Sequence, residues 1–255
     1  MLTVSTQLAR EDDLATFTQM LKSVSFADEI LIFNLERTDP AALSLFHRFH
    51  ARIIEVKTPP VIERIRNRQI REAKGDWVLV MDYDEIIPPK LATEIKTIIS
   101  RSPSFAAYQI KRRNYSLGMP LSHGGFGADY VHRLFNRARF RTWPPTIHST
   151  PQVDGPVGRL HATMEHHKDA SLSQMVIKTN RYSKIEAQQF LDGGLALVTR
   201  FTLIRKIGME FCRRYILKLG FLDGRIGLLQ ALYQSYSVFL TYAKLYELQK
   251  KGQRG

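Results

Sequence analysis

The stretch Asp76–Pro89, DWVLVMDYDEIIPP, places three carboxylates directly after a run of apolar residues. The five residues that begin at Trp77 have the composition of a buried strand, and Asp82, Asp84 and Glu85 follow them before two prolines. Repulsion between the carboxylates and their desolvation both oppose such an arrangement. A bound cation would remove this repulsion.

The first hundred residues alternate between short apolar runs and helical patterns. Strands are predicted over 2–8, 29–35, 52–57 and 77–82, and helices over 12–24, 39–50, 59–75 and 89–100. Alternation at this spacing predicts an α/β fold with a parallel, doubly wound sheet. In such sheets ligands bind beyond the carboxyl ends of the strands, which is where Asp82 to Glu85 fall.

The rest of the chain divides into a loop-rich part and a helical part. A strand is predicted over 106–114, and Tyr130–Asn136 and Arg139–Thr142 are predicted to pair across a turn. From Ser171 the pattern is helical to the end of the chain. The sequence therefore predicts two domains, residues 1–170 and residues 171–255.

Ile226–Ala243 carries no charge over 18 residues, a length that could suit a membrane span. Its Gln, Ser and Thr residues make it too polar for that role. Its apolar residues form a helical stripe: Ile226, Leu229, Leu232, Tyr233, Tyr236 and Leu240. We interpret the segment as a helix packed on the core or on a partner, with an interfacial membrane helix as the alternative.

The composition narrows the class of protein. The chain has 255 residues, 44% of them apolar, and a single cysteine, Cys212, so we expect a globular protein of a reducing compartment. The N-terminal segment lacks the pattern of a signal peptide, and a cytoplasmic location is expected.

The net charge of +13 lies in the later parts of the chain. Residues 1–100 carry 13 Lys/Arg against 15 Asp/Glu, whereas residues 196–255 carry 11 against 3. A basic surface of this kind suits nucleic acid, anionic lipid or a phosphorylated substrate. No zinc spacing or aromatic RNA-binding signature favours nucleic acid, which we do not expect as a partner.

Asp82 and Asp84 are two residues apart, so in an extended backbone they point the same way and can reach one cation together. An Asp-x-Asp at a strand exit suits Mg²⁺ or Mn²⁺, which keep open positions for phosphate oxygens. A solvated acidic turn that caps the next helix is the alternative.

Longer blocks of sequence resemble one enzyme family. RNRQIREAKGDWVLVMDYDEIIP resembles the central block of inverting glycosyltransferases of the GT-A type (glycosyltransferase family 2). The later blocks HGGFGADYVHRLFNR, IHSTPQVDGPVGRL and EHHKDASLSQMVIKTNRYSKIEA resemble, in the same order, bacterial heptose-directed glucosyltransferases of the lipopolysaccharide core. The resemblance implies a GT-A fold (a Rossmann-like, doubly wound mixed sheet) over residues 1–170, with a helical extension over 171–255. It also implies a nucleotide-sugar donor, a divalent ion and a membrane-associated saccharide acceptor.

The resemblance also implies roles for single residues on the donor side. Asp82 corresponds to the residue near the donor ribose. Asp84 corresponds to the residue that binds the metal, and this metal bridges the diphosphate. Arg66 and Asn67 match the Arg-Asn pair of the donor pocket. His166, with His167 as a substitute, falls where the family has a histidine that completes the metal shell.

An inverting transfer needs a base that deprotonates the acceptor hydroxyl. Asp129 is the first candidate, because it lies in the loop-rich part downstream of the metal motif, as the base does in this fold class. His148 and His123 are the alternatives.

The sequence departs from the family pattern at the end of the second strand. There, in IFNLERTDP, Asn34 replaces an Asp that grips the nucleotide, while Asp39 remains. Asn34 can still bond a base or ribose, but uridine specificity is weakened. Ser149 stands where a Glu often follows the histidine at 148. A member with altered donor use, or without activity, stays open.

The expected function is hexosyl transfer, with inversion, from a nucleotide-diphosphate sugar to a cell-envelope or lipopolysaccharide saccharide. The enzyme is expected on the cytoplasmic face of the membrane, held peripherally by its basic helical region. Two alternatives from other classes are a metal-dependent phospho- or nucleotidyltransferase and a non-catalytic basic module that binds membrane or nucleic acid.

Overall fold

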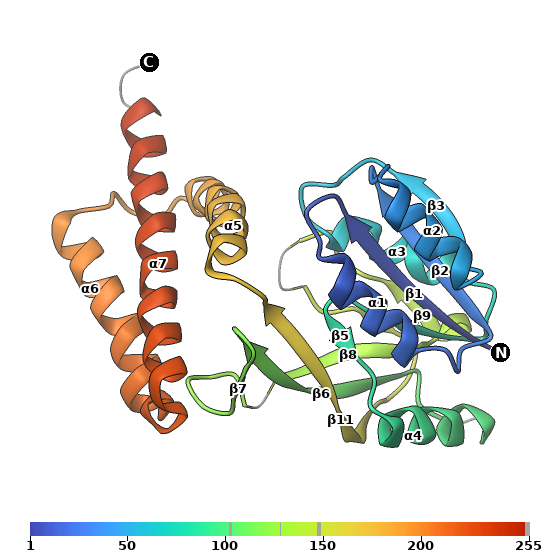
Figure 1. Cartoon of the computed structure of the whole chain (residues 1–255). Coiled ribbons are helices and arrows are strands. Elements are labelled where there is room, and N and C mark those ends of the chain that lie inside the picture. The colour runs from blue at the N-terminus through green and yellow to red at the C-terminus, as the bar shows by residue number, and fades with distance from the viewer. Residues whose placement is uncertain (102–103, 128, 147–148, 253–255) are drawn as a thin grey trace. The chain divides into compact units, whose positions relative to one another are not determined.

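The computed structural model describes residues 1–101, 104–127, 129–146 and 149–252 (Figure 1). The chain forms two compact units. The α/β unit comprises residues 1–112 and 129–166, and the helical unit comprises residues 113–128 and 167–255.

The α/β unit is built on a mixed sheet in which four parallel strands, in the order β3-β2-β1-β4, are followed by antiparallel ones. The full order is β3-β2-β1-β4-β8-β6-β11-β5, with β7 beside β6 and a separate β9–β10 ribbon. The strands are β1 Leu2–Ala9, β2 Glu29–Leu35, β3 Arg52–Val56, β4 Trp77–Val80, β5 Glu85–Ile86, β6 Ala107–Ser116, β7 Met119–Leu121, β8 Asp129–Asn136, β9 Phe140–Thr142, β10 Gln152–Val153 and β11 Val157–Asp169. The central strand β1 is buried throughout, and its Val4 pairs with Ile30 on one side and Leu79 on the other.

Helices cover both faces of this sheet. They are α1 Leu14–Ser23, α2 Pro40–Arg48, α3 Glu63–Arg71 and α4 Pro89–Ser100. One apolar core joins alternate residues of β1 and β4 to α1, α2 and α4, with Phe17 and Phe46 in edge-to-face contact. The core on the other face joins the remaining alternate residues of β2 and β4 to α3 and to Trp143. The predicted doubly wound α/β class is thereby confirmed.

Local sequence signals set the helix starts. The carboxylate of Asp13 accepts a hydrogen bond from the backbone N–H of Thr16 at the start of α1, at 2.7 Å. Asp39 caps α2 in the same way through Ala42, with Pro40 in the first helical position. Both are favourable N-terminal arrangements for a helix.

The helical unit contains three long helices, as Figure 1 shows in orange and red. They are α5 Leu172–Asp192, α6 Arg200–Phe211 and α7 Gly224–Gly252. A π-helical turn, Cys212–Leu217, and a 3-10 turn, Gly220–Asp223, join α6 to α7. The prediction of a helical C-terminal region is confirmed. Among the described residues, no helix is long and apolar enough to cross a membrane.

One predicted pairing is wrong. Tyr130–Asn136 does not pair with Arg139–Thr142: β8 inserts between β4 and β6, and β9 pairs with β10 instead. In the sequence, the short turn between the two segments suggests a hairpin. That turn is the 3-10 segment Arg137–Arg139, which carries the chain away from the sheet.

Candidate functional site

The carboxylate of Asp82 lies just beyond the end of β4 and has three partners. Its Oδ1 accepts hydrogen bonds from Arg66 Nη2 at 2.5 Å and from Gln7 Nε2 at 2.8 Å. Its Oδ2 accepts one from Arg133. Burial alone would raise the pKa of Asp82, but the charges of Arg133 and Arg66 and the bonds from Arg66 and Gln7 hold it well below its usual range.

Glu85 has no exposed surface and is compensated by two arginines. Its Oε1 lies 2.7 Å from Arg133 Nη2 and 3.3 Å from Arg112 Nη1, and its Oε2 accepts the backbone N–H of Asp82 at 3.0 Å. Burial lowers the pKa of the Arg133 guanidinium, but the charges of Asp82 and Glu85 more than offset this and raise it above its usual value. Arg133 is thus a buried cation between two carboxylates.

Asp129, the predicted base, lies at the start of β8 next to this cluster. Its Oδ2 accepts two hydrogen bonds from Arg112, from Nε at 2.9 Å and from Nη2 at 2.8 Å. Arg112 also reaches Glu85, so it connects Asp129 to the strand exit. The charges of Asp82 and Glu85 are therefore met by guanidinium groups of the chain itself, those of Arg66, Arg112 and Arg133.

Asp84 lies on the same exit and faces a histidine. β5 pairs with β11 so that His166 stands opposite Glu85, and His166 Nε2 lies 3.7 Å from Oδ1 of the buried Asp84. A carboxylate oxygen and an imidazole nitrogen are a donor pair that suits Mn²⁺ and is less typical of Mg²⁺, which prefers oxygen. Across the described ranges, no group of three or more His, Cys, Asp or Glu is arranged to hold a metal ion. The predicted metal ligands are thus brought together as a pair.

Asn34 and Asp39 gather around the loop that follows β2. The buried amide of Asn34 donates to the carboxylate of Glu55 at 2.9 Å and exchanges hydrogen bonds with the backbone of Arg37. The Arg37 guanidinium donates to Asp39 at 2.5 Å and to the carbonyl of Asp12 at 2.6 Å. The hydrogen bond from Arg37 lowers the pKa of Asp39. This loop is therefore anchored to the β1–α1 loop.

Arg66 and Asn67 are neighbours on α3 with different surroundings. The buried Arg66 guanidinium lies 5.6 Å from the ring of Trp143 and donates to Gln69 and Asp82. The side-chain amide of Asn67 donates to the backbone carbonyl of Trp143 and accepts a hydrogen bond from the backbone N–H of the same residue, both at 2.8 Å. Asn67 thus fixes the position of the indole that Arg66 faces.

The structure describes one of the two histidine alternatives for the base. His148 lies outside the described residues. His123 belongs to the helical unit, where its Nδ1 lies 2.7 Å from Oδ1 of Asp223. The α/β unit itself therefore brings together Arg66, Asp82, Asp84, Asp129 and His166.

Arg112, Arg133 and the buried glutamines of this site are not among the residues predicted from the sequence. Arg133 lies on β8 beside the apolar pair Leu134 and Phe135, at the point where the register between β6 and β8 shifts, and nothing in the local sequence pattern distinguishes it. Gln7 on β1 and Gln69 on α3 complete the network around Arg66, with 2.8 Å between the Gln69 amide nitrogen and the Gln7 oxygen.

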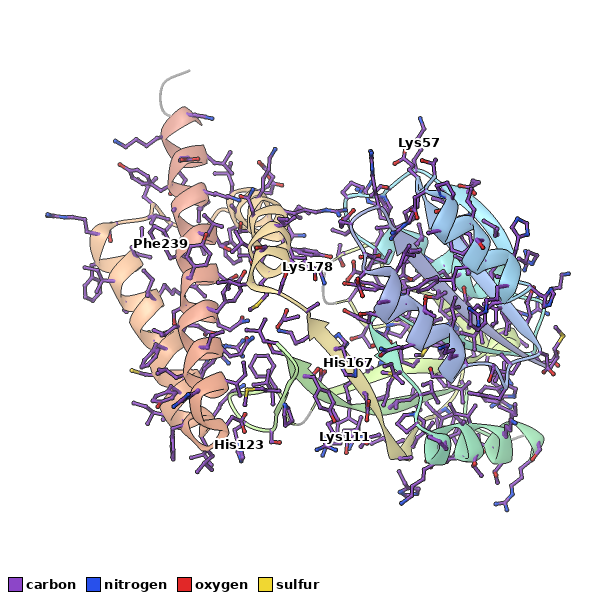
Figure 2. All side chains as sticks on the ribbon, in the orientation of Figure 1. Lys57, Lys111, His123, His167, Lys178 and Phe239 are labelled. Atoms are coloured by element: carbon purple, nitrogen blue, oxygen red, sulfur yellow. The ribbon has the colours of Figure 1, made fainter. Side chains whose placement is uncertain are left out.

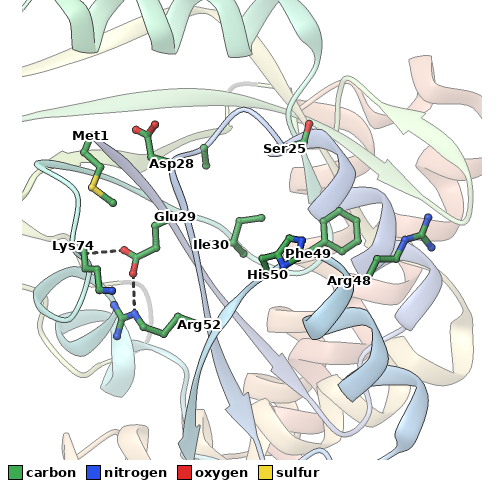
Figure 3. A pocket seen from close by; sticks show the side chains of 11 residues that line it. Met1, Ser25, Asp28, Glu29, Ile30, Arg48, Phe49, His50, Arg52 and Lys74 are labelled. Atoms are coloured by element: carbon green, nitrogen blue, oxygen red, sulfur yellow. Dashed lines mark hydrogen bonds and ion pairs between the residues drawn. The ribbon is translucent and has the colours of Figure 1, made fainter.

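A separate hollow lies at the opposite end of the parallel strands (Figure 3). It has a volume of about 480 Å³ and is lined by the starts of β1, β2 and β3, with Glu29 on its wall. Glu29 accepts hydrogen bonds from Arg52 at 2.8 Å and from the backbone of Lys74 at 2.9 Å. It is remote from the strand exits, where doubly wound sheets bind ligands.

Over nearly its whole length the chain is similar to bacterial proteins of the genus Rickettsia. It is 26% identical over 265 residues to a Rickettsia prowazekii protein named an uncharacterized glycosyltransferase, a match over 98% of this chain and 89% of the relative. A Rickettsia typhi protein of the same description is 26% identical, over 97% of this chain and 88% of the relative. No protein-family model matches the chain. The shared name confirms the predicted enzyme class at the level of glycosyl transfer.

Solved structures give a weaker likeness. A mannosyltransferase from Pyrobaculum calidifontis, in complex with GDP-Man and Mn²⁺, matches 99% of this chain and 79% of its own at 12% identity and a TM-score of 0.48. S. aureus TarS 1–349 matches 98% and 91% at 11% identity and a TM-score of 0.45. At these TM-scores the likeness carries no argument about donor, acceptor or metal.

Proposed function

We propose that the chain transfers a hexose from a nucleotide-diphosphate sugar to a saccharide of the cell envelope, with inversion, in a GT-A type of active site. The observation that carries this proposal is the cluster beyond β4, at the ligand-binding edge of a doubly wound sheet. There Asp82, Glu85 and Asp129 meet three arginines, and Asp84 faces His166. The Rickettsia relatives support the reaction class.

We propose that the nucleotide-sugar donor binds at the carboxyl ends of β1, β2 and β4. Asp82, kept ionised by Arg66 and Arg133, presents a fixed acceptor to a ribose hydroxyl. Asn34 and Asp39 lie on the loop after β2, which would bound the nucleoside. Because the amide of Asn34 is already bonded to Glu55 and to the loop backbone, its contribution is to hold the loop in shape.

Asp84 and His166 are the residues that would hold a divalent ion, Mn²⁺ in preference to Mg²⁺. When bound, the ion would supply positive charge to the diphosphate that leaves the sugar. The chain's own arginines serve a different end: Arg112 and Arg133 neutralise Glu85 and Asp129 and so keep a dense group of carboxylates stable in one place.

Asp129 is the proposed base. Two N–H groups of Arg112 hold its Oδ2, which fixes the direction of the carboxylate. A carboxylate oriented in this way can take the proton of an acceptor hydroxyl at the moment when the oxygen attacks the sugar carbon. His148 stays the alternative base.

The basic, helical part of the chain fits an acceptor that is anchored in a membrane. We place the enzyme on the cytoplasmic face of the membrane, where phosphate groups of a lipid-linked acceptor or anionic lipids would meet its excess of Lys and Arg. A saccharide of the lipopolysaccharide core is the acceptor class that the sequence resemblance favours.

The test is release of nucleoside diphosphate from a panel of nucleotide sugars, with and without Mn²⁺, using wild type, Asp84→Ala and Asp154→Asn. Asp154 is an exposed acidic residue between β10 and β11 and serves as the matched control. We expect metal-dependent release by wild type and Asp154→Asn and its loss in Asp84→Ala. Release of phosphate or pyrophosphate instead would favour a phospho- or nucleotidyltransferase.

A further inference from the structure

The last helix buries polar side chains and displays apolar ones. Along α7, the side chains of Gln230, Ser235 and Thr241 are buried. Five apolar side chains that share one stripe of the helix are 39–55% exposed: Leu228, Leu232, Tyr236, Phe239 and Tyr246 (Phe239 is labelled in Figure 2). Of the alternatives predicted for this segment, packing on the core does not hold for Leu232 and Tyr236, and packing on a partner or at a membrane interface stays a prediction. An outward apolar stripe on a long helix is typical of a surface that contacts something else.

We name the turn between α6 and α7, residues 212–223, the helical tip. Its surface is more strongly apolar than that of α7. Leu217 is 77% exposed and Leu222 is 57% exposed, and three further apolar side chains of the tip are 46–53% exposed: Ile216, Leu219 and Phe221. On α6, Phe201 and Ile204, each 73% exposed, lie on one face of the helix. Such side chains would each gain free energy on leaving water.

The helical tip is rigidly built. Asp223 accepts hydrogen bonds from the backbone N–H groups of Ser122 and His123, at 3.0 and 2.8 Å, and from the imidazole of His123. Arg214 donates to the carbonyl of Gly124 at 3.0 Å, and the N–H of Gly124 donates to the carbonyl of Lys218 at 2.8 Å.

Close backbone packing adds to this rigidity. A Cβ on Gly220 would lie 2.6 Å from the carbonyl oxygen of Arg214, and a Cβ on Gly227 would lie 1.9 Å from that of Gly220. The fold therefore uses buried hydrogen bonds and glycine contacts to hold exposed leucines in a fixed position. A loop that served only as a connection would need neither.

The charge around these apolar residues selects their partner. Residues 199–225 contain seven Lys/Arg and two Asp/Glu. Both of the acidic side chains, Glu210 and Asp223, are already bound within the unit, Glu210 by Arg213 and Arg214. A second copy of the chain would bring an equal excess of positive charge to the same place. An anionic lipid surface offers an apolar interior beneath negative headgroups, which matches both properties.

We propose that the helical tip, together with the outer face of α6, is the surface by which the protein docks on an anionic lipid bilayer. Leu217, Leu222 and Phe221 enter the boundary between headgroups and acyl chains. Lys218 and the neighbouring arginines face the lipid phosphates. Docking of this kind is interfacial, in agreement with the absence of a membrane-crossing helix among the described residues. It concerns binding and does not depend on the proposed transfer reaction.

The experiment is flotation of the full chain with vesicles of phosphatidylcholine, with or without about one-third phosphatidylglycerol. We expect wild type to float with the anionic vesicles, and added salt to weaken this binding. A double variant with Leu217→Asp and Leu222→Asp should have a vesicle partition coefficient lower by about 10-fold or more. The reason is that transfer of each leucine side chain out of water is favourable in free energy. Lys218→Glu should weaken binding to the anionic vesicles.

The control is Leu43→Asp on α2 of the α/β unit, another exposed leucine (37% exposed), which should bind vesicles as wild type does. Thermal unfolding checks that each variant is folded. Wild-type protein that stays out of the vesicle fraction, or tip variants that float as well as wild type, would overturn the proposal. So would a dimer in sedimentation experiments that the tip variants dissociate, because a second copy would then be what covers the tip.

Discussion

Arg133 Nη2 lies 2.7 Å from Oε1 of Glu85, and both side chains are almost completely buried. The same guanidinium donates to Asp82, so one cation compensates two carboxylates that lie three residues apart. The charges of Asp82 and Glu85 are therefore compensated by the chain itself. A divalent ion would instead be bound by Asp84, which faces His166.

Replacement of Arg133 by Met should destabilise the fold strongly. The change keeps much of the side-chain volume but leaves Glu85 and Asp82 without their shared partner, and breaking a buried ion pair in this way costs about 3–5 kcal/mol. Urea denaturation would measure it. Arg137→Met, at an exposed arginine four residues further on, is the control and should have little effect. Equal stability of the two variants would show that Arg133 does not hold the acidic motif together.

The contribution of Asp82 to stability should depend on pH. Its pKa in the folded protein lies well below its usual range, so its ionised form stabilises the fold above the unfolded-state pKa of about 3.9. This stability is lost as the pH falls through the folded-state pKa. The difference in unfolding free energy between wild type and Asp82→Asn should therefore be largest near neutral pH and should shrink below about pH 4. A difference that stays constant from pH 7 to pH 3 would contradict this.

Asp84→Asn should weaken binding of Mn²⁺ to the full chain. Changes to residues that only support the metal ligands of a protein lower its affinity for the metal by about 10–100-fold. Loss of a ligand should therefore lower the affinity for Mn²⁺ by at least as much. Calorimetric titration with Mn²⁺, in the presence of a nucleoside diphosphate, measures the effect without reference to turnover. His166→Ala should act in the same direction, whereas Asp154→Asn should bind as wild type does.

Two glycines of the helical unit should respond in opposite ways to the same substitution. Gly208→Ala lies within α6, where a Cβ meets no atom within 4 Å, and should stabilise the helix by about 0.5–1 kcal/mol. Gly227→Ala would place its Cβ 1.9 Å from a carbonyl oxygen and should destabilise the helical unit. Thermal unfolding compares the stability of the two variants with that of wild type. A loss of stability in both would show that the space beside Gly208 is not open.

The parallel strands and the carboxylate motif could be predicted because their signals are local. The predicted strand 29–35 is β2 to the residue, and the predicted helix 89–100 is α4. The sequence also placed Asp82 and Asp84 correctly at a strand exit, because the apolar run before them fixes where β4 ends. Arg66 was found only through the resemblance to a family, since an arginine on a helix is usually exposed.

The compensating charges could not be predicted, because they come from distant parts of the chain. Arg112 and Arg133 reach Glu85 only after β6 and β8 have taken their places in the sheet. Nothing within a window of ten residues distinguishes them from surface arginines. Asn34 shows the converse limit: its position at the end of β2 suggested a ligand contact, but Glu55 on the neighbouring strand takes up its amide.

The order of the sheet also bears on how the chain folds. Strand β4 is flanked by β1, which starts the chain, and by β8, whose pairing residues lie more than fifty positions later. Pairings of such long sequence separation form slowly, because a long loop must close before the contact is gained. Until β8 arrives, Asp82 and Glu85 lack Arg133, so the strand exit cannot be desolvated. The charge cluster is therefore complete only when β8 has paired with β4, and the first hundred residues alone cannot form the site.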